Sequence, residues 1–396
     1  MTGLRKGMAE EMTDTGYFDW NATAPLRPQA RAAMLAVLDR VGNPSSVHAQ
    51  GRAARHHVEA ARGEVAALVG AAAKSVTFTA GGTEANILAL TPAIDIGGNK
   101  APCDRLLAST IEHPSVRAGG RFGAVTDIPV TAGGVVDLAA LERLLAGGGR
   151  PLVSVMLANN ETGAVQPIPE VARLVHQAGG VLHVDAVQAL GRIDIDINAL
   201  RADLLTLSAH KIGGPQGVGA LVTGRDDLHV APLTTGGGQE RGRRAGTENV
   251  AGIAGFGAAA AVVAAALPAE QARMRALRGR LEAGLKAARP DAVIFCEALE
   301  RLPNTTLVAI AGMKAETAII AFDLAGIAVS SGSACSSGKV TPSHVLGAMG
   351  VAPALAGAAI RISLGWSTTD AAVERLLDAW NKVTSSLLKG QTGLAA

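Results

Sequence analysis

Lys211 stands in an unusual local sequence, SAHKIGGPQGVG, in which Ser208 and His210 precede the lysine and several glycines follow it. The apolar run DLLTL comes just before, so the pattern predicts a strand that ends beside the lysine. An exposed lysine is the common case, but it needs none of these neighbours. A lysine that attacks a carbonyl group needs a confined position, anion-binding neighbours and room for a flat molecule.

Asp185, in HVDAVQALG, follows a second apolar run and precedes Gln188 by one helical turn. Taken alone, this carboxylate could cap a helix, bind a metal or a ribose, or pair with a protonated ring nitrogen. Together with Lys211 at the next strand end, it matches what pyridoxal 5'-phosphate requires. The lysine would form a Schiff base, and the carboxylate would keep the pyridine nitrogen protonated so that the ring accepts electrons.

The stretch FTAGGTEAN predicts a strand, a Gly-Gly turn and the start of a helix. Backbone N–H groups at such a helix start, together with the Thr83 hydroxyl, form an anion site that Ser208 and His210 could complete. An ordinary helix cap is the alternative. A nicotinamide-binding fingerprint fits poorly, because neither GGTEAN nor GGPQGVG gives GxGxxG after the first strand of a βαβ unit.

His113 and Cys335 are candidates for proton and sulfur chemistry. His113, in IEHPSV, could stack on the ring and move protons, since imidazole titrates near neutral pH; a structural histidine is the alternative. Cys335 lies in VSSGSACSSGKV, where small residues predict an exposed, mobile loop at about residues 330–342. This setting is typical of a reactive thiolate, although a tolerated surface thiol would look the same. The nine histidines show no HExxH or paired ligand spacing, so we expect no metal site.

The elements that must position these residues alternate between strands and helices. Strand candidates are PLVSVMLA, VLHVDA, DLLTLSA and GVGALVTG, and PEVARLVHQAG predicts a helix opened by proline and closed by glycine. The alternation predicts a mostly parallel sheet covered by helices, with ligands beyond the carboxyl ends of the strands. After the alanine-rich run that starts at Val250, a charged helix, the strand TTLVAI and the Cys335 loop predict a second domain from about Ala269.

Length and composition limit the class of protein. The 396 residues exceed one typical domain, and 48% hydrophobic residues allow a large core. A net charge of +2 gives no electrostatic footprint for nucleic acid, and three widely spaced cysteines favour a reducing cytoplasm. The charged N-terminus lacks the apolar core of a secretory signal. The run from Val250 to Ala269 has the length of a bilayer span, but its Ala and Gly content favours a buried helix. We expect a cytoplasmic protein that binds neither nucleic acid nor membrane.

Taken in order, these motifs resemble the cysteine desulfurases, NifS-like members of the class V aminotransferase group of fold-type I pyridoxal-phosphate enzymes. The resemblance runs from YFDWNATAPLRP through NNETGAVQPI and GGGQERGRRAGTENV to AAIRISLGWSTT, and SAHK together with SSGSAC is its most specific part. It implies an α/β fold with a mostly parallel seven-stranded sheet in a large domain at residues 30–268. A smaller α+β domain, residues 1–29 and 269–396, would carry the cysteine loop.

The resemblance also implies a role for each matched residue. Lys211 would form the Schiff base, Asp185 would pair with the ring nitrogen, and His113 would stack on the ring and transfer protons. Gln188 would hydrogen-bond the ring hydroxyl, and Asn160 would contact both cofactor and substrate. The residues expected at the phosphate are Gly82, Thr83, Ser208, His210 and, from the neighbouring subunit of a homodimer, Thr247. Arg361 would hold the substrate carboxylate with its planar guanidinium.

The implied activity is that of a pyridoxal-phosphate-dependent cysteine desulfurase, a sulfurtransferase that converts L-cysteine to L-alanine and leaves a persulfide on Cys335. The long cysteine loop resembles the subgroup that supplies iron–sulfur assembly. Cys335 would then pass sulfur to a scaffold or other acceptor protein, or transiently ligate a cluster on it. A selenocysteine lyase, a class V aminotransferase and a non-catalytic sulfur-relay protein that binds partners remain the alternatives.

Overall fold

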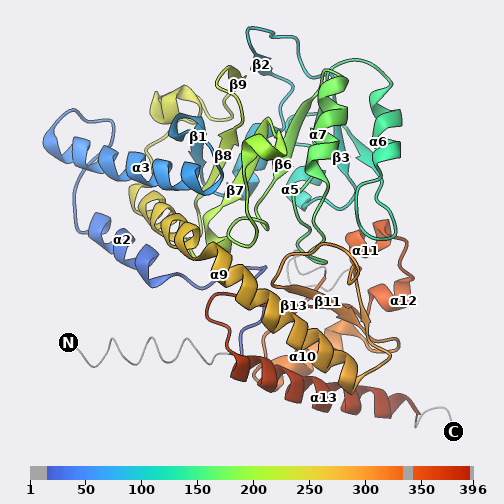
Figure 1. The fold of residues 1–396 in the computed structure, drawn as a ribbon. Helices are drawn as coiled ribbons and strands as arrows, with labels where there is room; N and C mark the ends of the chain where they lie inside the picture. The colour runs from blue at the N-terminus through green and yellow to red at the C-terminus, as the bar shows by residue number, and fades with distance from the viewer. Residues whose placement is uncertain (1–15, 333–341, 393–396) are drawn as a thin grey trace.

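The computed structural model describes residues 16–332 and 342–392 (Figure 1). Cys335 and most of its predicted loop fall outside the described residues. A large part with a central sheet and a smaller part with its own sheet are joined by one long helix, α9 (Val250–Ala288).

The central sheet has seven strands in the order β1-β8-β7-β6-β5-β3-β4. The strands are β1 (Val76–Thr79), β3 (Arg105–Ser109), β4 (Val125–Ile128), β5 (Pro151–Ser154), β6 (Val181–Asp185), β7 (Leu204–Ser208) and β8 (Gly219–Thr223). All neighbours from β4 to β7 pair in parallel, whereas β8 runs antiparallel to both β7 and β1. The predicted mostly parallel seven-stranded sheet is therefore confirmed.

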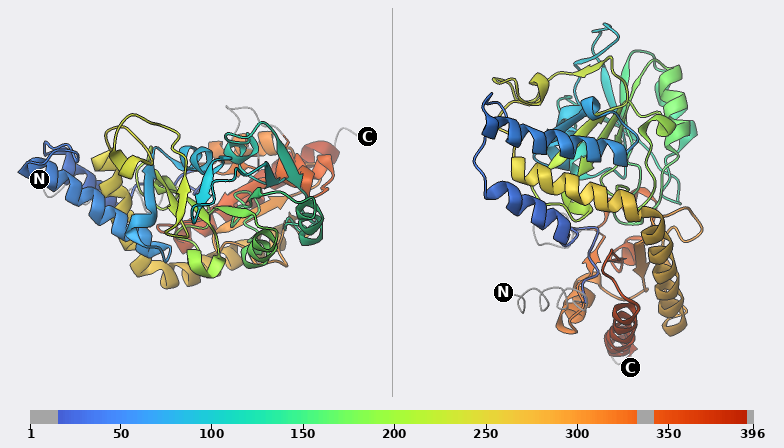
Figure 2. Two further views of the ribbon diagram at one scale, coloured as in Figure 1. Left: turned by 90° about the horizontal axis from the view of Figure 1, so that it is seen from above. Right: turned by 60° about the vertical axis from the view of Figure 1, so that its left-hand side comes forward.

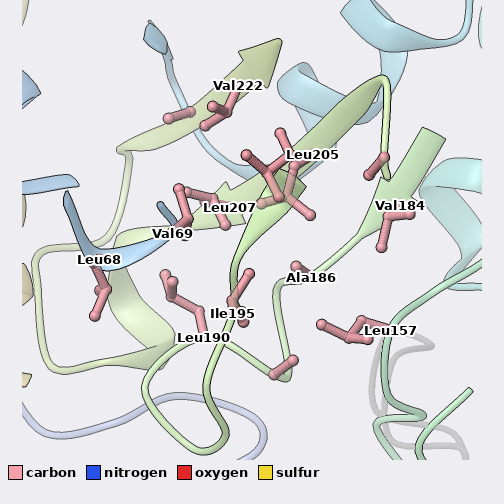
Figure 3. Packing of buried hydrophobic residues seen from close by; sticks show 14 of the residues in the cluster. Leu68, Val69, Leu157, Val184, Ala186, Leu190, Ile195, Leu205, Leu207 and Val222 are labelled. Carbon is pink, nitrogen blue, oxygen red and sulfur yellow. The ribbon is translucent and has the colours of Figure 1, made fainter. Parts of the chain in front are cut away.

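The two faces of this sheet are set by strand alternation, because successive side chains point in opposite directions. Leu205 and Leu207 of β7 join the main core cluster, where they pack with Val184 of β6 and Val222 of β8 (Figure 3). Leu204 belongs to the cluster on the other face. Ser208 at the end of β7 and Asp185 at the end of β6 consequently leave the sheet on the face opposite the main core.

Helices cover both faces of the sheet. The main core cluster receives apolar side chains from α3 (Ala49–Leu68), α6 (Leu138–Leu145), α7 (Ile168–Gln177) and the first part of α9. The opposite face is covered by α4 (Gly82–Ala89) and α5 (Pro114–Arg117). The remaining elements of the large part are α2 (Pro28–Leu38), α8 (Ile197–Leu200), the short pair β2 (Ile94–Ile96) and β9 (Leu228–Val230), and the 3₁₀ turns η1 (Ala73–Ser75), η2 (Ala209–Lys211) and η3 (Gln239–Gly242).

The smaller part is built on an antiparallel four-stranded sheet in the order β10-β11-β13-β12. Its elements are β10 (Val293–Ile294), β11 (Thr305–Ala309), β12 (Ser330–Ser331), β13 (Ile360–Ser363), α10 (Ala315–Leu324), α11 (His344–Ala348), α12 (Pro353–Ala356) and α13 (Asp370–Thr392). Phe322 and Trp380 stack at the centre of its core. The large and the small part each have their own core, as two domains would. The domain bounds near residues 30 and 268 stay a prediction.

Helix α9 runs across the predicted start of the second domain near Ala269, and the alanine-rich run and the charged helix that follows it form one element. It is one helix of 39 residues that continues through Pro268, with Phe256 in the main core and Leu281 in the second. Figure 2 (right) shows α9 changing direction between its two parts, as an internal proline causes. Among the described helices, α9 alone is long and apolar enough to cross a membrane, yet half of its most apolar window is buried. Packing against α2 and α3 favours a core helix.

The segment before α2 connects the two parts. Phe18 lies in the second core, and its N–H donates to the Ala328 carbonyl at 2.8 Å. Asp19 forms a bridge with Ser363 of β13. A few residues later, the Ala24 N–H donates to the His210 carbonyl at 2.9 Å, in the large part. This segment therefore passes directly over the carboxyl end of β7.

Candidate active site

A cavity of about 320 Å³ opens at the carboxyl ends of the parallel strands, which is within the usual size of a small-ligand site. Ten of the residues predicted from the sequence line it: Gly82, Thr83, His113, Asn160, Asp185, Gln188, Ser208, His210, Lys211 and Arg361. The structure thus brings together residues that are far apart in the chain. Asn21, Ala22, Asn86 and Ser115 also line the cavity and were not among the predicted residues.

Lys211 reaches the cavity because β7 ends at Ser208 and the chain turns at once into η2. Its Nζ donates to the carbonyl oxygens of Asn21 at 2.6 Å and Ala22 at 2.8 Å. Gln188 Nε2 donates to the same Asn21 oxygen at 3.0 Å. The segment before α2 therefore forms one wall of the cavity and orients both the amine and the amide.

Asp185 is held by two N–H donors at the end of β6. Asn86 Nδ2 donates to its Oδ2 at 2.9 Å, and the Val187 backbone N–H donates to its Oδ1 at 3.0 Å. The side chain is 6% exposed, so little solvent competes for its oxygens. This geometry fixes a carboxylate that can pair with a positively charged ligand atom.

His113 caps α5 and is tied to Asp185 through two intermediate side chains. Asn86 Nδ2 donates to Ser115 Oγ at 2.9 Å, and Ser115 Oγ lies 2.8 Å from His113 Nδ1. The Ser115 backbone N–H also donates to Nδ1, at 3.1 Å. Because that N–H can only donate, Nδ1 is the acceptor and the neutral ring carries its proton on Nε2. Burial lowers the pKa of His113, so this neutral form is favoured at pH 7.

His210 is also neutral at pH 7. Burial, followed by the charges of Lys211 and Arg192, lowers the pKa of His210 to about 4. Its Nδ1 lies 3.2 Å from Thr23 Oγ1. A neutral imidazole in this position can donate one hydrogen bond to an anion without adding a charge.

Arg361 projects from β13 and is 3% exposed. Its NH2 pairs with Asp19 Oδ1 at 2.7 Å, and its NH1 donates to the Asn160 carbonyl at 3.1 Å. Its Nε is buried and has no hydrogen-bond partner among the described residues. The guanidinium is thus fixed in orientation and keeps one N–H for a further acceptor, such as a carboxylate.

The start of α4 supplies the anion-binding part of the cavity. Gly81, with φ of 154°, precedes the helix and offers no side chain to cap its first N–H groups. A Cβ on Gly82 would lie 3.0 Å from Val187 Cγ2 and 3.4 Å from Ser208 Cβ, so the helix start packs closely against the end of β7 and the residues that follow β6. The uncapped helix start, Thr83 and Ser208 therefore line the same cavity, and together they could bind a phosphate group.

One predicted residue of the described part of the chain, Thr247, does not line this cavity. Thr247 is exposed and borders a separate hollow with Phe78, Glu240 and Arg244. The contact of Thr247 with a neighbouring subunit therefore stays a prediction. Cys335 lies outside the described residues.

The comparisons with known proteins identify the family. A model described as aminotransferase class-V matches residues 16–376. The chain belongs to the class-V aminotransferase family. It is 44% identical over 379 residues to a cysteine desulfurase of Cereibacter sphaeroides, covering 94% of this chain and 96% of that protein. It is also 39% identical over 368 residues to cysteine desulfurase IscS 1 of Archaeoglobus fulgidus, covering 91% of this chain and 95% of that protein.

Two solved structures have the same fold. A NifS-like protein from Rickettsia africae matches with a TM-score of 0.81 and 35% identity, covering 93% of this chain and 99% of that one. SspA in complex with cysteine matches with a TM-score of 0.73 and 29% identity, covering 88% of this chain and 98% of that one. The resemblance to NifS-like cysteine desulfurases and the fold-type I class are therefore confirmed.

Two of the residues that the sequence did not predict, Asn86 and Ser115, lie inside motifs described above. Asn86 ends the FTAGGTEAN stretch, and Ser115 follows His113 by two residues. A buried amide beside a predicted carboxylate is a recognisable signal, since buried polar groups need partners. Asn21 contributes a backbone carbonyl, a role that cannot be predicted from the residue type.

Proposed function

We propose that the protein is a pyridoxal-phosphate-dependent cysteine desulfurase that converts L-cysteine to L-alanine and collects the sulfur as a persulfide on Cys335. The observation that carries the proposal is the placement of the Lys211 amine, the Asp185 carboxylate and the uncapped start of α4 around one cavity. Similarity to cysteine desulfurases along nearly the whole chain supports the same reaction.

The residues present fit pyridoxal phosphate. The start of α4, Thr83, Ser208 and His210 would hold the phosphate, and Asp185 would face the ring nitrogen. Asn86 Oδ1 is buried without a partner among the described residues, which indicates a polar ligand beside it. When bound, the cofactor supplies an electron sink that weakens the bonds to the substrate carbon that carries the amino group.

The chain's own residues bind and orient the substrate. Arg361, through the N–H groups in the plane of its guanidinium, would hold the L-cysteine carboxylate beside Asn160. The Lys211 amine can accept and return a proton near the substrate carbon. His113 presents Nε2–H, which can donate a hydrogen bond there, and its ring would transfer a proton only after taking one up.

Sulfur transfer is assigned to Cys335 as a thiolate, the reactive form of cysteine. The thiolate sulfur would bond to the substrate sulfur, and the substrate C–S bond would break. The electron pair of that bond would stay with carbon, which takes a proton and leaves as alanine. No outside oxidant or reductant is needed for this step.

Partners and location are part of the same proposal. We propose a cytoplasmic homodimer in which Thr247 reaches the phosphate site of the neighbouring subunit. The persulfide would pass to an iron–sulfur scaffold or another sulfur acceptor, in keeping with the curated relatives named as cysteine desulfurase IscS.

The test is to incubate the holoenzyme with L-cysteine and a reductant and to measure alanine and sulfide together. Equal amounts of both products are expected, and Cys335→Ser should make neither while keeping the visible absorbance of bound cofactor. Cys296→Ser is the matched control, because that half-buried thiol donates to the Gly133 carbonyl and should be dispensable.

Other outcomes would replace the proposal by one of its alternatives. Turnover of L-selenocysteine without turnover of L-cysteine indicates a selenocysteine lyase. Amino-group transfer to a 2-oxo acid without sulfide indicates an aminotransferase. Failure to bind the cofactor indicates a sulfur-relay protein.

A further inference from the structure

Glu161 is a buried carboxyl group that the proposed reaction leaves without a role. It follows Asn160 in the turn after β5 and is 2% exposed. Ser343 Oγ donates to its Oε2 at 2.5 Å. A Cβ on Gly332 would lie 2.5 Å from the same oxygen, so the Gly332 backbone rests against the carboxyl group.

Gly332 and Ser343 flank segment 333–341, which carries Cys335. The two flanks meet at Glu161, since the Cβ built on Gly332 would also lie 3.4 Å from Ser343 Cβ. One side chain therefore contacts both the entry and the exit of the segment.

Each flank is also connected to a residue group that lines the active-site cavity. On the entry side, Ser330 of β12 pairs with Arg361 of β13. On the exit side, Ser343 caps α11 by accepting the Leu346 N–H at 3.1 Å, and His344 Nε2 lies 3.0 Å from the Glu112 carbonyl, next to His113. The entry flank is therefore connected to Arg361 on one side of the cavity, and the exit flank is connected to the residue next to His113 on the other side.

The backbone around Glu161 is itself fixed. Asn159 Oδ1 accepts the Glu161 N–H at 2.9 Å and the Thr162 N–H at 3.0 Å. The Asn160 carbonyl accepts Arg361 NH1 at 3.1 Å. A carboxyl group on such a turn can transmit the position of Arg361 to the flanks of the segment.

Opposing effects determine the pKa of Glu161. Burial raises the pKa of Glu161 to about 7, and the Ser343 hydrogen bond and the Arg361 charge oppose the rise. Both the ionised and the neutral carboxyl group can accept the Ser343 hydroxyl. Glutamine, which keeps a carbonyl oxygen of the same reach, is therefore the conservative replacement.

We propose that Glu161 is a positioning residue that fixes both flanks of the Cys335 segment to the turn that holds Arg361. The two flanks of the Cys335 segment and Arg361, which is proposed to bind the substrate carboxylate, would then belong to one rigid unit. The proposal rests on the proposed function for its consequence in turnover, but its structural part is measurable without turnover.

The experiment compares the holoenzyme with Glu161→Ala, Glu161→Gln and Glu282→Gln. Glu282 is the control for the loss of a buried carboxylate at another place. It accepts Thr306 Oγ1 at 2.8 Å and pairs with the buried Arg301 at 2.8 Å, so its variant loses stability, and no described hydrogen bond connects it to Gly332 or Ser343. Limited trypsin digestion reports cleavage after Lys339, read as release of fragment 340–396 by mass spectrometry. Stopped-flow absorbance reports L-cysteine binding at the cofactor, and persulfide on Cys335 is measured in parallel.

Glu161→Ala should raise the cleavage rate after Lys339 by about fivefold, as expected when one hydrogen bond that holds the flanks is lost. Persulfide formation should fall about tenfold or more, as expected when a reacting group loses its position, while L-cysteine binding stays within about twofold. Glu161→Gln should restore most of both properties, and Glu282→Gln should leave both unchanged.

Equal cleavage rates in the wild type and Glu161→Ala would overturn the positioning role, whatever the activity. An equal loss of L-cysteine binding and persulfide formation would also overturn it, because the side chain would then serve the cavity itself. If the wild type makes no persulfide, the proposed function fails, and the digestion still decides whether Glu161 holds the segment.

Discussion

Two buried carboxyl groups near the cavity differ in their hydrogen-bond contacts. Asp185 accepts two N–H hydrogen bonds and faces Lys211 and His113 across the cavity. Glu112, one residue before His113, is fully buried; its Oε1 accepts Ser109 Oγ at 2.5 Å and the Met156 N–H at 2.7 Å. Its Oε2 has no partner within the described structure. A charge on Glu112 would therefore be poorly stabilised.

Glu112 gives a prediction about stability and pH. Burial, with a smaller contribution from Asp185, raises the pKa of Glu112 from 4.5 to about 8. Between these values the native protein keeps a proton that the unfolded chain has released, so stability is lost as pH rises. The free energy of unfolding should fall by about 1.4 kcal/mol per pH unit from this group. Glu112→Gln, which mimics the neutral acid, should remove this component.

The measurement is the thermal unfolding midpoint of the wild type and Glu112→Gln holoenzymes at pH 5.5 and 7.5. Between these pH values, the wild-type midpoint should fall by several degrees more than that of the variant. Other titrating groups, Glu161 included, are present in both proteins and cancel in the comparison. Parallel pH dependences would mean that Glu112 is ionised in the native state.

The connection between β9 and α9 is held by a buried ion pair. Glu240 accepts Arg62 NH1 at 2.6 Å, Arg62 NH2 at 2.8 Å and the Phe78 N–H at 2.9 Å. Glu240 and Arg241 have φ of 47° and 59°, values that non-glycine residues seldom adopt. The contacts with α3 and β1 therefore determine the backbone of the connection that carries Thr247.

Glu240→Ala should lower the free energy of unfolding by about 3–5 kcal/mol, because Arg62 would keep a buried charge without its partner. Lys74→Ala is the control, since Lys74 and Asp226 form an exposed pair at 2.6 Å that contributes at most about 1 kcal/mol. Urea unfolding monitored by circular dichroism separates the two. Equal midpoints for the two variants would contradict a structural role for the buried pair.

Sharing of residues between subunits can be tested at the level of the whole assembly. Lys211→Ala alone should abolish turnover, and Thr247→Ala should weaken cofactor affinity about five- to tenfold through one lost hydrogen bond. In a mixed dimer of these two variants, one site would combine the intact Lys211 of one subunit with the intact Thr247 of the other. Turnover at limiting cofactor should therefore reappear in differently tagged, purified mixed dimers.

Each homodimer of a single variant, assayed at the same cofactor concentration, serves as the reference. Mixed dimers that never exceed half of the Thr247→Ala activity would show that Thr247 acts within its own subunit. Chains that remain monomeric during gel filtration would remove the basis of the subunit-sharing proposal.

Local signals predicted the mostly parallel sheet and part of the cavity, whereas Asn160 and Arg361 were expected only from the family resemblance. Apolar runs that end in Asp185 or just before Lys211 specify strands with chemistry at their ends, and GlyGlyThr marks the start of α4. The wall formed by the Asn21 and Ala22 carbonyls could not be predicted, because backbone carbonyls carry no residue signature. The contacts of Glu161 also depend on tertiary packing, and the continuity of α9 through Pro268 overrides a local break signal.

The route of the segment before α2 has a consequence for the order of events during synthesis. Asp19 and Arg361 form their ion pair across 342 residues of sequence, and the Asn21 N–H bonds Ser363 Oγ over the same separation. At a ribosomal rate of about 5–20 residues per second, the first of these partners waits roughly 20–70 seconds for the second. The large sheet can fold during that time, but the wall beside Lys211 closes only when β13 has left the ribosome. Nascent chains should therefore complete the site last, after the large sheet has formed.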